Sequence, residues 1–471
     1  MRLTIHSKNI LFLFSGEIVA RFFGFLATIY LARILGTDKF GVIHIGLAVL
    51  AYGIIIGNSG LSYLGTRNVS GKQGNIAETT GHILVNRMIL SLFVFIVANA
   101  IVVLFVSSTE VKEIIIVYLI YLFPTALILD WYFQGKQQMG VIAGGRLLAT
   151  ILYLIFILIF VNTEQDAANV AWSWVMGAAA NMGLLFVIFI HKKNHLIFSW
   201  KLRELTSLIC KSYTLGGADL ISQIVLQFPA IYLAIIVSNS AVGEFSAAFK
   251  IILLLLIFDR IFLTIFYPVV SRCFYESPEQ LSVVFNNVLK LVSVFSFYIG
   301  LCAIISADFL IRTIFGEQFL AATTIFQILV VYFIFTMINS VLTFTLIGME
   351  KENIYTKSLI GGMFVFGSIL LLTGTSFGTT GAAIAIVFYI ITSLIIMAVN
   401  LKKMISFSLT RTLLLPSLLG IIFIFLLSDF IIVSIPLKVC VVTLFALPLL
   451  TFACGIGLSE IRYLKRSLIW N

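Results

Sequence analysis

The chain has 471 residues, of which 61% are hydrophobic and 11% are charged, and its formal net charge is +10. A soluble protein has about 25% charged residues. The composition therefore excludes a soluble globular protein and predicts a protein that crosses a membrane several times. The five cysteines are scattered without metal-ligand spacing, so they predict neither a disulfide framework nor a metal site.

Hydropathy predicts an all-α protein with about 14 membrane-spanning helices. Their expected bounds are 9–34, 42–64, 83–107, 113–133, 143–162, 169–191, 213–237, 242–268, 287–306, 323–348, 359–374, 380–400, 412–428 and 437–457. Most lysines and arginines fall in loops on the side of the N-terminus, while five lie on the opposite side: Arg33, Lys39, Lys112, Arg312 and Lys438. The positive-inside rule therefore predicts that both ends are cytoplasmic. Nucleic-acid binding is not expected, because no segment has a basic face with interleaved aromatic residues.

Two halves of the sequence repeat each other at an offset of 202 positions. Glu17 corresponds to Asp219, the Tyr-Leu-Ala run at 30–32 recurs at 232–234, and Gly41 corresponds to Gly243. With six helices in each repeat, we predict two lobes, related by a pseudo-twofold axis along the membrane normal, around a central cavity. The expected organisation is a lobe at 1–191, a cytoplasmic linker at 192–212, a lobe at 213–401, and two additional helices with a cytoplasmic tail at 402–471.

Polar side chains in the first helix of each repeat share one helix face. Glu17 and Arg21 are four residues apart, and Asp219, Gln223 and Gln227 follow the same spacing. A charge at bilayer depth costs several kcal/mol unless it is paired or hydrated. We therefore expect these faces to line a common aqueous cleft. The alternative for Glu17 and Arg21 is an ion pair that only holds one helix in place.

Other polar groups lie deep in the second repeat. They are Lys250, Asp259 and Arg260 in the eighth helix, Lys290 in the ninth and Asn339 in the tenth. Because charged and polar groups at these positions also have a high free-energy cost in lipid, we expect most of them to border the same cleft.

Three charges near helix ends have interpretations that do not require the cleft. Lys290 and Arg87 either line the cleft or extend to the membrane interface. Asp130 precedes Trp131 and Tyr132, and this run is typical of an interfacial aromatic belt.

Several short segments occur in a fixed order between the first and twelfth helices. They are Gly-Thr-Arg-Asn-Val at 65–69, Asp-Trp-Tyr-Phe-Gln-Gly-Lys at 130–136, Tyr267-Pro268 before Ser271-Arg272, Phe-Gly-Glu-Gln-Phe at 315–319 and Gly-Met-Glu-Lys at 348–351. The first resembles the Gly-Thr-Arg-Glu-Ile segment of polysaccharide-unit exporters, and the second resembles the Trp-Phe-Phe-Gln-Gly motif of O-antigen flippases. The ordered set is similar to the Wzx-type flippases of the multidrug/oligosaccharidyl-lipid/polysaccharide exporter superfamily. Asn68 and Gln137-Gln138 depart from the family pattern, which affects only expected loop contacts.

The resemblance implies a flippase that moves an oligosaccharide on undecaprenyl pyrophosphate from the inner to the outer leaflet of the bacterial cytoplasmic membrane by alternating access. The residues expected to attract the pyrophosphate are Arg21, Lys250, Arg260 and Lys290, and those expected to bind sugars are Gln223, Gln227 and Asn339. Glu17 and Asp219 are candidates for ion coupling. The expected partners are the lipid-linked oligosaccharide and membrane lipids, with a polysaccharide polymerase and a chain-length regulator as candidate protein partners. We expect a monomer without a cofactor.

Two other functions remain open on sequence grounds. A cation-coupled multidrug antiporter of the same superfamily could use Glu17 and Asp219 to exchange a proton for a cation. A membrane glycosyltransferase or polysaccharide polymerase would usually need a large extramembrane loop, whereas no predicted outside loop exceeds roughly 15–20 residues. No nucleophile–base constellation, metal motif or phosphate-binding loop is found, so an enzyme is not expected.

Overall fold

The computed structural model describes residues 5–71, 75–197, 223–276, 278–407 and 442–455, with five isolated positions between 415 and 422. Side chains are described from Val19 onward, apart from positions 261, 263–265 and 276–279. The elements of this part of the chain are helices, and it contains no strand. Nine of its helices are long and apolar enough to cross a membrane. The predicted all-α polytopic fold is confirmed.

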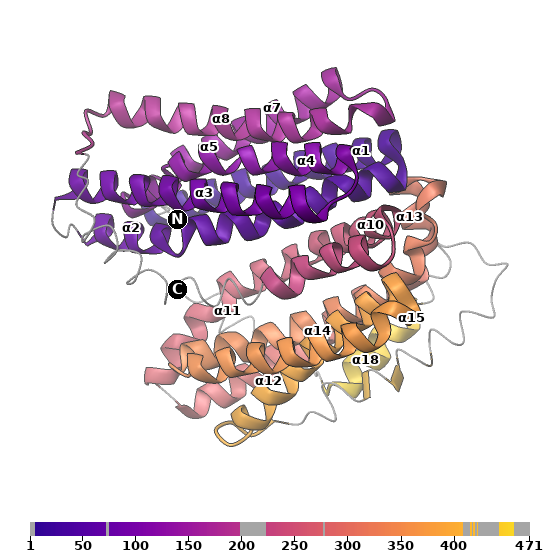
Figure 1. Cartoon of the computed structure of the whole chain (residues 1–471). Helices are drawn as coiled ribbons and strands as arrows, with labels where there is room; N and C mark the ends of the chain where they lie inside the picture. The colour runs from indigo at the N-terminus through magenta and orange to yellow at the C-terminus, as the bar shows by residue number, and fades with distance from the viewer. Residues whose placement is uncertain are drawn as a thin grey trace. The chain divides into compact units, whose positions relative to one another are not determined.

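The chain divides into two compact units, and the boundary follows Gly243. The first unit contains α1 (Ile5–Asn58), α2 (Leu61–Ser70), α3 (Ile76–Phe105), α4 (Thr109–Ile120), α5 (Leu122–Leu127), α6 (Asp130–Gly135), α7 (Met139–Phe160), the short η1 (Glu164–Asp166), α8 (Ala167–His191) and a helix at Gln223–Ile236. In this unit α7 packs along both α8 and α1, α1 also contacts α3 and α4, and α2 packs on α6 (Figure 1).

The second unit is built around α14. Its elements are α10 (Asn239–Leu255, which starts before the boundary), α11 (Ile257–Glu276), α12 (Pro278–Ile305), α13 (Ala307–Phe315), η2 (Glu317–Phe319), α14 (Ala322–Gly348), α15 (Glu352–Leu401), η4 (Val442–Ala446) and α18 (Leu447–Ala453). The central α14 contacts α11, α12 and α15, and α12 also contacts α18. Most of the predicted linker and most of the residues after 407 lie outside the described part, so the lobe bounds stay a prediction.

Glycines interrupt the two longest helices. Gly36 in α1 has φ 69° and Gly378 in α15 has φ 53°, and neither conformation is helical. Only glycine adopts this region readily, because it has no Cβ. Each long element therefore consists of two helices. These breaks lie where hydropathy separated 9–34 from 42–64 and 359–374 from 380–400.

Two predicted single helices contain breaks in the structure. The predicted helix 113–133 consists of α4, α5 and α6, with a first break at Tyr121 and a second after Leu127. Pro124 has no backbone N–H and its ring clashes with the carbonyl four residues earlier, which explains why α4 ends at Ile120. The predicted helix 242–268 is likewise divided into α10 and α11, and α11 continues to Glu276. Hydropathy does not detect these breaks, because the residues around them are also apolar.

The two clearest sequence motifs pack directly on each other. Gly65 of α2 faces Trp131 of α6 so closely that a Cβ at position 65 would lie 2.4 Å from the indole ring. The Thr66 hydroxyl also donates a hydrogen bond of 3.1 Å to the Trp131 carbonyl. Trp131, Tyr132 and Phe133 belong to a buried cluster and are at most 3% exposed. The interfacial belt expected for this run is therefore wrong, because helix packing buries all three rings.

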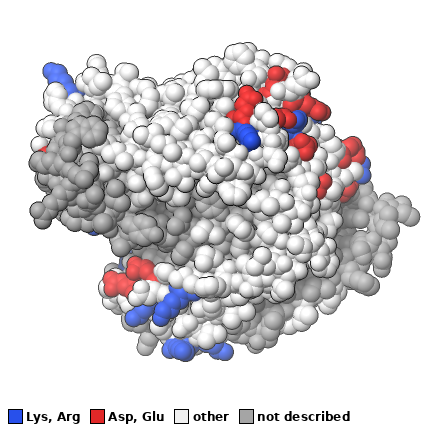
Figure 2. Space-filling model, viewed as in Figure 1, with Lys and Arg blue, Asp and Glu red and all other residues white. Residues whose placement is uncertain are grey.

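The outer surfaces of the long helices are apolar. On α3, for example, Phe93, Ile96, Leu104 and Phe105 are all more than half exposed. Figure 2 shows that charged side chains gather in small groups with a wide uncharged surface between them. Such a surface suits contact with lipid tails, and the chain is a multi-pass membrane protein.

Candidate substrate cavity

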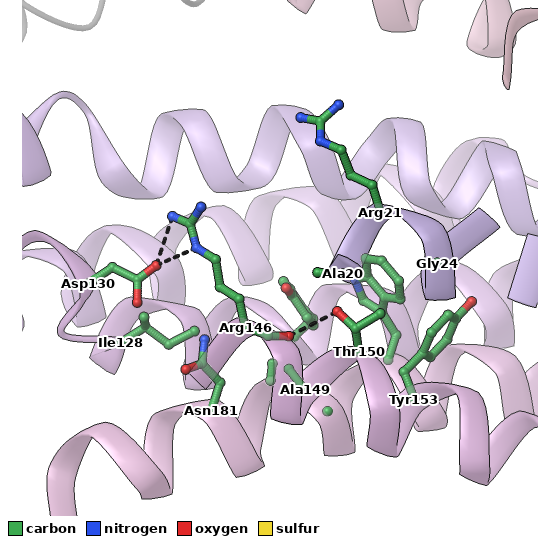
Figure 3. Close-up of a pocket in the computed structure, with 14 residues that line it drawn as sticks. Ala20, Arg21, Gly24, Ile128, Asp130, Arg146, Ala149, Thr150, Tyr153 and Asn181 are labelled. Carbon is green, nitrogen blue, oxygen red and sulfur yellow. Dashed lines mark hydrogen bonds and ion pairs between the residues drawn. The ribbon is translucent and has the colours of Figure 1, made fainter. Parts of the chain in front are cut away.

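A cavity of about 520 Å³ lies inside the first unit (Figure 3). It is lined by Ala20, Arg21 and Gly24 of α1, Tyr121 and Ile128 beside α5, Asp130 of α6, Arg146, Ala149, Thr150 and Tyr153 of α7, and Trp174, Gly177, Ala178 and Asn181 of α8. Sites for small molecules usually measure about 300–1,000 Å³. The cavity is therefore large enough for part of a substrate.

Glycines bring the helices behind the cavity close together. A Cβ at Gly177 of α8 would lie 2.8 Å from the carbonyl oxygen of Ala149 on α7. A Cβ at Gly145 would lie 2.2 Å from Oδ1 of Asn181. The Asn181 side chain is 5% exposed, and its Oδ1 has no hydrogen-bond partner. The close packing of α7 on α8 thus fixes a buried amide group in the cavity wall.

An ion pair crosses one end of the cavity. The Nε and Nη2 atoms of Arg146 donate to Oδ2 of Asp130 at 3.1 and 3.0 Å (Figure 3). Asp130 begins α6, where the positive end of the helix dipole favours a carboxylate. Arg146 is nearly half exposed and Asp130 about one quarter exposed, so water and ligands can reach the pair.

Arg87 stabilises the backbone between α5 and α6, next to the Asp130–Arg146 ion pair. Its guanidinium is buried and donates to the Thr125 carbonyl at 2.7 Å and to the Ile128 carbonyl at 3.0 Å. These carbonyls lie at the break between α5 and α6, where backbone acceptors lose their intrahelical partners. Extension of Arg87 to the membrane interface, one of the two sequence interpretations, is therefore wrong. The Arg87 guanidinium instead donates hydrogen bonds to backbone carbonyls at the break between α5 and α6.

A second cavity, of about 310 Å³, adjoins the first. Both cavities are lined by Ile128, Asp130 and Arg146, and the second is also lined by Arg87 and by Asn58, Ser62, Tyr63, Thr66, Thr125, Trp131 and Gln134. The Asp130–Arg146 ion pair thus borders both cavities. Together they are lined by three arginines, Arg21, Arg87 and Arg146, and one aspartate.

Three aromatic rings form another wall of the larger cavity. The rings of Tyr121 and Trp174 are stacked with centroids 6.0 Å apart and planes inclined by 30°. Tyr153 meets Trp174 edge to face, with centroids 4.6 Å apart and an interplanar angle of 85°. The cavity therefore combines an aromatic wall with charged and amide groups.

The structure places the sequence-predicted residues of the first unit as follows. Arg21 lines the larger cavity, and its guanidinium is directed away from the side chains of Arg146 and Tyr153 (Figure 3). Gln223 and Gln227 lie on one helix face and are joined by a hydrogen bond of 3.4 Å. The side chain of Glu17 and the whole of Asp219 lie outside the described residues.

The predicted residues of the second unit stand on four helices. Lys250 is half-buried on α10, and Arg260 is exposed on α11. Lys290 of α12 donates a hydrogen bond of 3.1 Å to the Gly455 carbonyl, which follows α18. Asn339 of α14 is 7% exposed, and its Oδ1 has no hydrogen-bond partner. No group of three His, Cys, Asp or Glu side chains in the described ranges is placed to hold a metal ion.

Sequence reasoning missed the Asp130–Arg146 pair. Arg146 lies close to the start of the predicted helix 143–162, so on sequence grounds the positive-inside rule alone accounts for its charge. The two residues are 16 positions apart across a turn, a separation that no helix or strand periodicity connects. The aromatic wall was missed for a similar reason, since its rings come from three separate segments.

Comparison with known proteins identifies the family. Residues 7–274, more than half of the chain, match the family described as polysaccharide biosynthesis protein. A Shigella dysenteriae protein provisionally named as an O-antigen transporter is 22% identical over 248 residues, which are 52% of this chain and 62% of that protein. The chain thus matches less than two thirds of this relative's length.

Solved structures share the fold. The lipid II flippase MurJ, in an inward closed conformation, superposes with a TM-score of 0.75 at 13% identity over 98% of this chain and 100% of that chain. An inward-facing multidrug resistance MATE family transporter of the MOP superfamily gives a TM-score of 0.63 at 15% identity over 82% of this chain and 94% of that chain. Identities this low establish the fold alone.

The resemblance to proteins of polysaccharide export, inferred from the ordered motifs, is confirmed at the level of the family, and the solved structures share the fold. By its sequence, this chain belongs to the polysaccharide biosynthesis protein family.

Proposed function

We propose that this protein is a flippase that moves an undecaprenyl-pyrophosphate-linked oligosaccharide from the inner to the outer leaflet of the bacterial cytoplasmic membrane. Both chain ends lie in the cytoplasm in this proposal, and transport proceeds by alternating access. The observation that carries the proposal is the cavity inside the first unit, where Arg21, Arg146 and an aromatic wall lie among membrane-spanning helices. The family match supports a role in polysaccharide biosynthesis.

The physical argument concerns the head group. A pyrophosphate and a glycan cannot cross hydrocarbon unaided, because their charges and hydroxyl groups would lose water without compensation. A cavity with guanidinium groups supplies charge-assisted hydrogen bonds to the phosphates. The polyprenyl tail can stay in the surrounding lipid during this step. The reaction breaks no covalent bond, so the protein needs to supply only binding and a change of access.

The proposed roles extend the sequence prediction. Arg21, Lys250 and Arg260 attract the pyrophosphate, with Arg146 as an additional contact. The other residues kept in the proposal are Lys290 for the pyrophosphate, Gln223, Gln227 and Asn339 for the sugars, and Glu17 and Asp219 for ion coupling. Lys290 can take part only if it leaves the Gly455 carbonyl.

A multidrug antiporter is the second candidate, because the MATE family transporter shares the fold. An antiporter that binds organic cations needs an available carboxylate in its cavity. Among the described lining residues of the larger cavity, Asp130 is the single carboxylate, and Arg146 already pairs with it. The charge of the cavity therefore favours the anionic lipid.

The deciding experiment is depletion of this protein in its own host. We expect undecaprenyl-linked oligosaccharide to accumulate at the inner leaflet and surface polysaccharide to be lost. Wild-type protein should restore both, and Arg21→Ala at equal membrane abundance should not. Absence of accumulation together with greater sensitivity to cationic drugs would favour the antiporter.

A further inference from the structure

We propose that the larger cavity of the first unit is a subsite for a sugar ring of the glycan, with Tyr121, Tyr153 and Trp174 as its stacking wall. This inference rests on the proposed flippase function and adds the part of the substrate that the cavity recognises. It assigns the arginines to the phosphates and the aromatic wall to the carbohydrate.

The first support is the chemistry of the wall. A pyranose ring has one or both faces covered by C–H groups, and such faces pack well on aromatic rings, whose π faces carry partial negative charge. Trp174 is held between Tyr121, stacked at 6.0 Å, and Tyr153, edge to face at 4.6 Å. The Trp174 ring is thus fixed in orientation before a ligand arrives, which lowers the entropic cost of binding.

The second support is the space opposite the rings. The lining residues of α1 that have little side-chain volume are Ala20 and Gly24. A Cβ at Gly24 would meet no atom within 4 Å, so this part of the cavity is open. An aromatic wall facing small residues leaves a slot for a flat, ring-shaped group.

The third support is the set of polar groups at the rim. Sugar hydroxyls both donate and accept hydrogen bonds, so they need donors and acceptors near each other. Asn181 offers an amide, and its buried Oδ1 has no partner in the protein. The Thr150 hydroxyl donates to the Arg146 carbonyl at 2.9 Å and still has accepting capacity. The carboxylate of Asp130, which also lines the cavity, adds acceptor oxygens beside them (Figure 3).

These features favour a glycan over other occupants. A lipid tail would leave Oδ1 of Asn181 without a partner, which is unfavourable for a buried polar atom. An organic cation would have to compete with Arg146 for Asp130. A neutral sugar next to an anionic phosphate uses both the wall and the rim.

The test compares two lipids on the same purified full-length protein. One is undecaprenyl diphosphate without sugar, and the other is the undecaprenyl-diphosphate oligosaccharide extracted from cells depleted of this protein. Dissociation constants are measured by native mass spectrometry. We expect wild-type protein to bind the glycosylated lipid about tenfold more tightly, a ratio typical of one stacking contact with hydrogen bonds.

Trp174→Leu should reduce this ratio to near one and leave the binding of undecaprenyl diphosphate unchanged. Trp172→Leu is the matched control, because Trp172 is on the same helix and is 44% exposed. Tyr121→Leu serves as a second variant if Trp174→Leu does not fold. Because the readout is a ratio of two affinities in one preparation, partial loss of folded protein does not imitate the effect.

The outcomes separate this inference from the proposed function. Equal binding of both lipids by wild-type protein, with the oligosaccharide lipid still accumulating on depletion, would overturn the sugar subsite and leave the flippase intact. An unchanged ratio in both Trp174→Leu and Tyr121→Leu would also overturn the subsite. Binding of neither lipid, with no accumulation, would remove the proposed function and this inference with it.

Discussion

Gly41 of α1 and Gly243, the last residue of the first unit, lie against each other. A Cβ at Gly41 would fall 1.8 Å from the Asn239 carbonyl oxygen, and one at Gly243 would fall 2.0 Å from the Thr37 carbonyl oxygen. These glycines are the same pair that the repeat offset of 202 positions relates. The contact is thus close to symmetric, and each helix offers a glycine to the carbonyl of the other. Small residues that bring backbones together are typical of helix crossings in membranes.

We expect Gly41→Ala to destabilise the protein strongly, because the added methyl group meets backbone and not a flexible side chain. Overpacking of this kind usually costs about 1–3 kcal/mol. The effect is measured as a change in the melting temperature in detergent, which is determined from the loss of monodisperse protein on heating. Gly144→Ala on α7 is the control, since a Cβ there meets nothing within 4 Å. Equal melting temperatures for the two variants would contradict the crossing.

Arg87→Ala should also destabilise the first unit, through the backbone. Its guanidinium holds the Thr125 and Ile128 carbonyls, and hydrogen bonds from a charged donor are worth about 1.5–3 kcal/mol each. We expect a lower melting temperature and partial recovery in Arg87→Lys, which keeps the charge but not the two-pronged geometry. Arg67→Ala on the exposed face of α2 is the comparison. A loss of transport without a change in melting temperature would instead assign Arg87 to substrate binding.

Arg146 and Asp130 should have opposite effects on binding. Arg146→Ala removes a phosphate contact, so we expect undecaprenyl diphosphate to bind about tenfold more weakly. Asp130→Asn removes the carboxylate that competes for Arg146, so binding should strengthen while release slows. Native mass spectrometry gives both constants, with Arg67→Ala as a control for general loss of positive charge. If Arg146→Ala and Arg67→Ala weaken binding equally, Arg146 has no specific role.

Ion coupling can be tested at the two repeat-related acids. Desolvation in a cleft favours a protonated carboxyl group, so Glu17 and Asp219 are candidates to bind and release a proton. We expect Glu17→Gln and Asp219→Asn to reduce the dependence of flipping on an imposed proton gradient. Flipping of the oligosaccharide lipid in proteoliposomes, with and without the gradient, measures this dependence. A wild-type dependence in both variants would exclude the two acids from coupling.

The sequence could predict much of the fold because membrane helices are read from uninterrupted apolar stretches. Gly36 and Gly378 were visible as gaps between such stretches, and the ordered motifs identified the family. The breaks after Ile120 and Leu255 were not visible, because apolar residues continue through them. In the cavity, Arg21 was found because a charge stands out in an apolar helix. Asp130, Arg146 and the aromatic wall were not, because only the packing of α7 and α8 against the segment 121–130 brings them together.

The contact between Gly65 and Trp131 has a consequence for how sequences of this family evolve. Because a larger residue at 65 would displace the indole ring, a substitution at one position changes what the other tolerates. The hydroxyl of Thr66 adds a bond from one segment to the backbone of the other. We therefore expect the two segments to evolve as a pair, so that chimaeras which exchange only one of them between relatives fold poorly, while those that exchange both are tolerated.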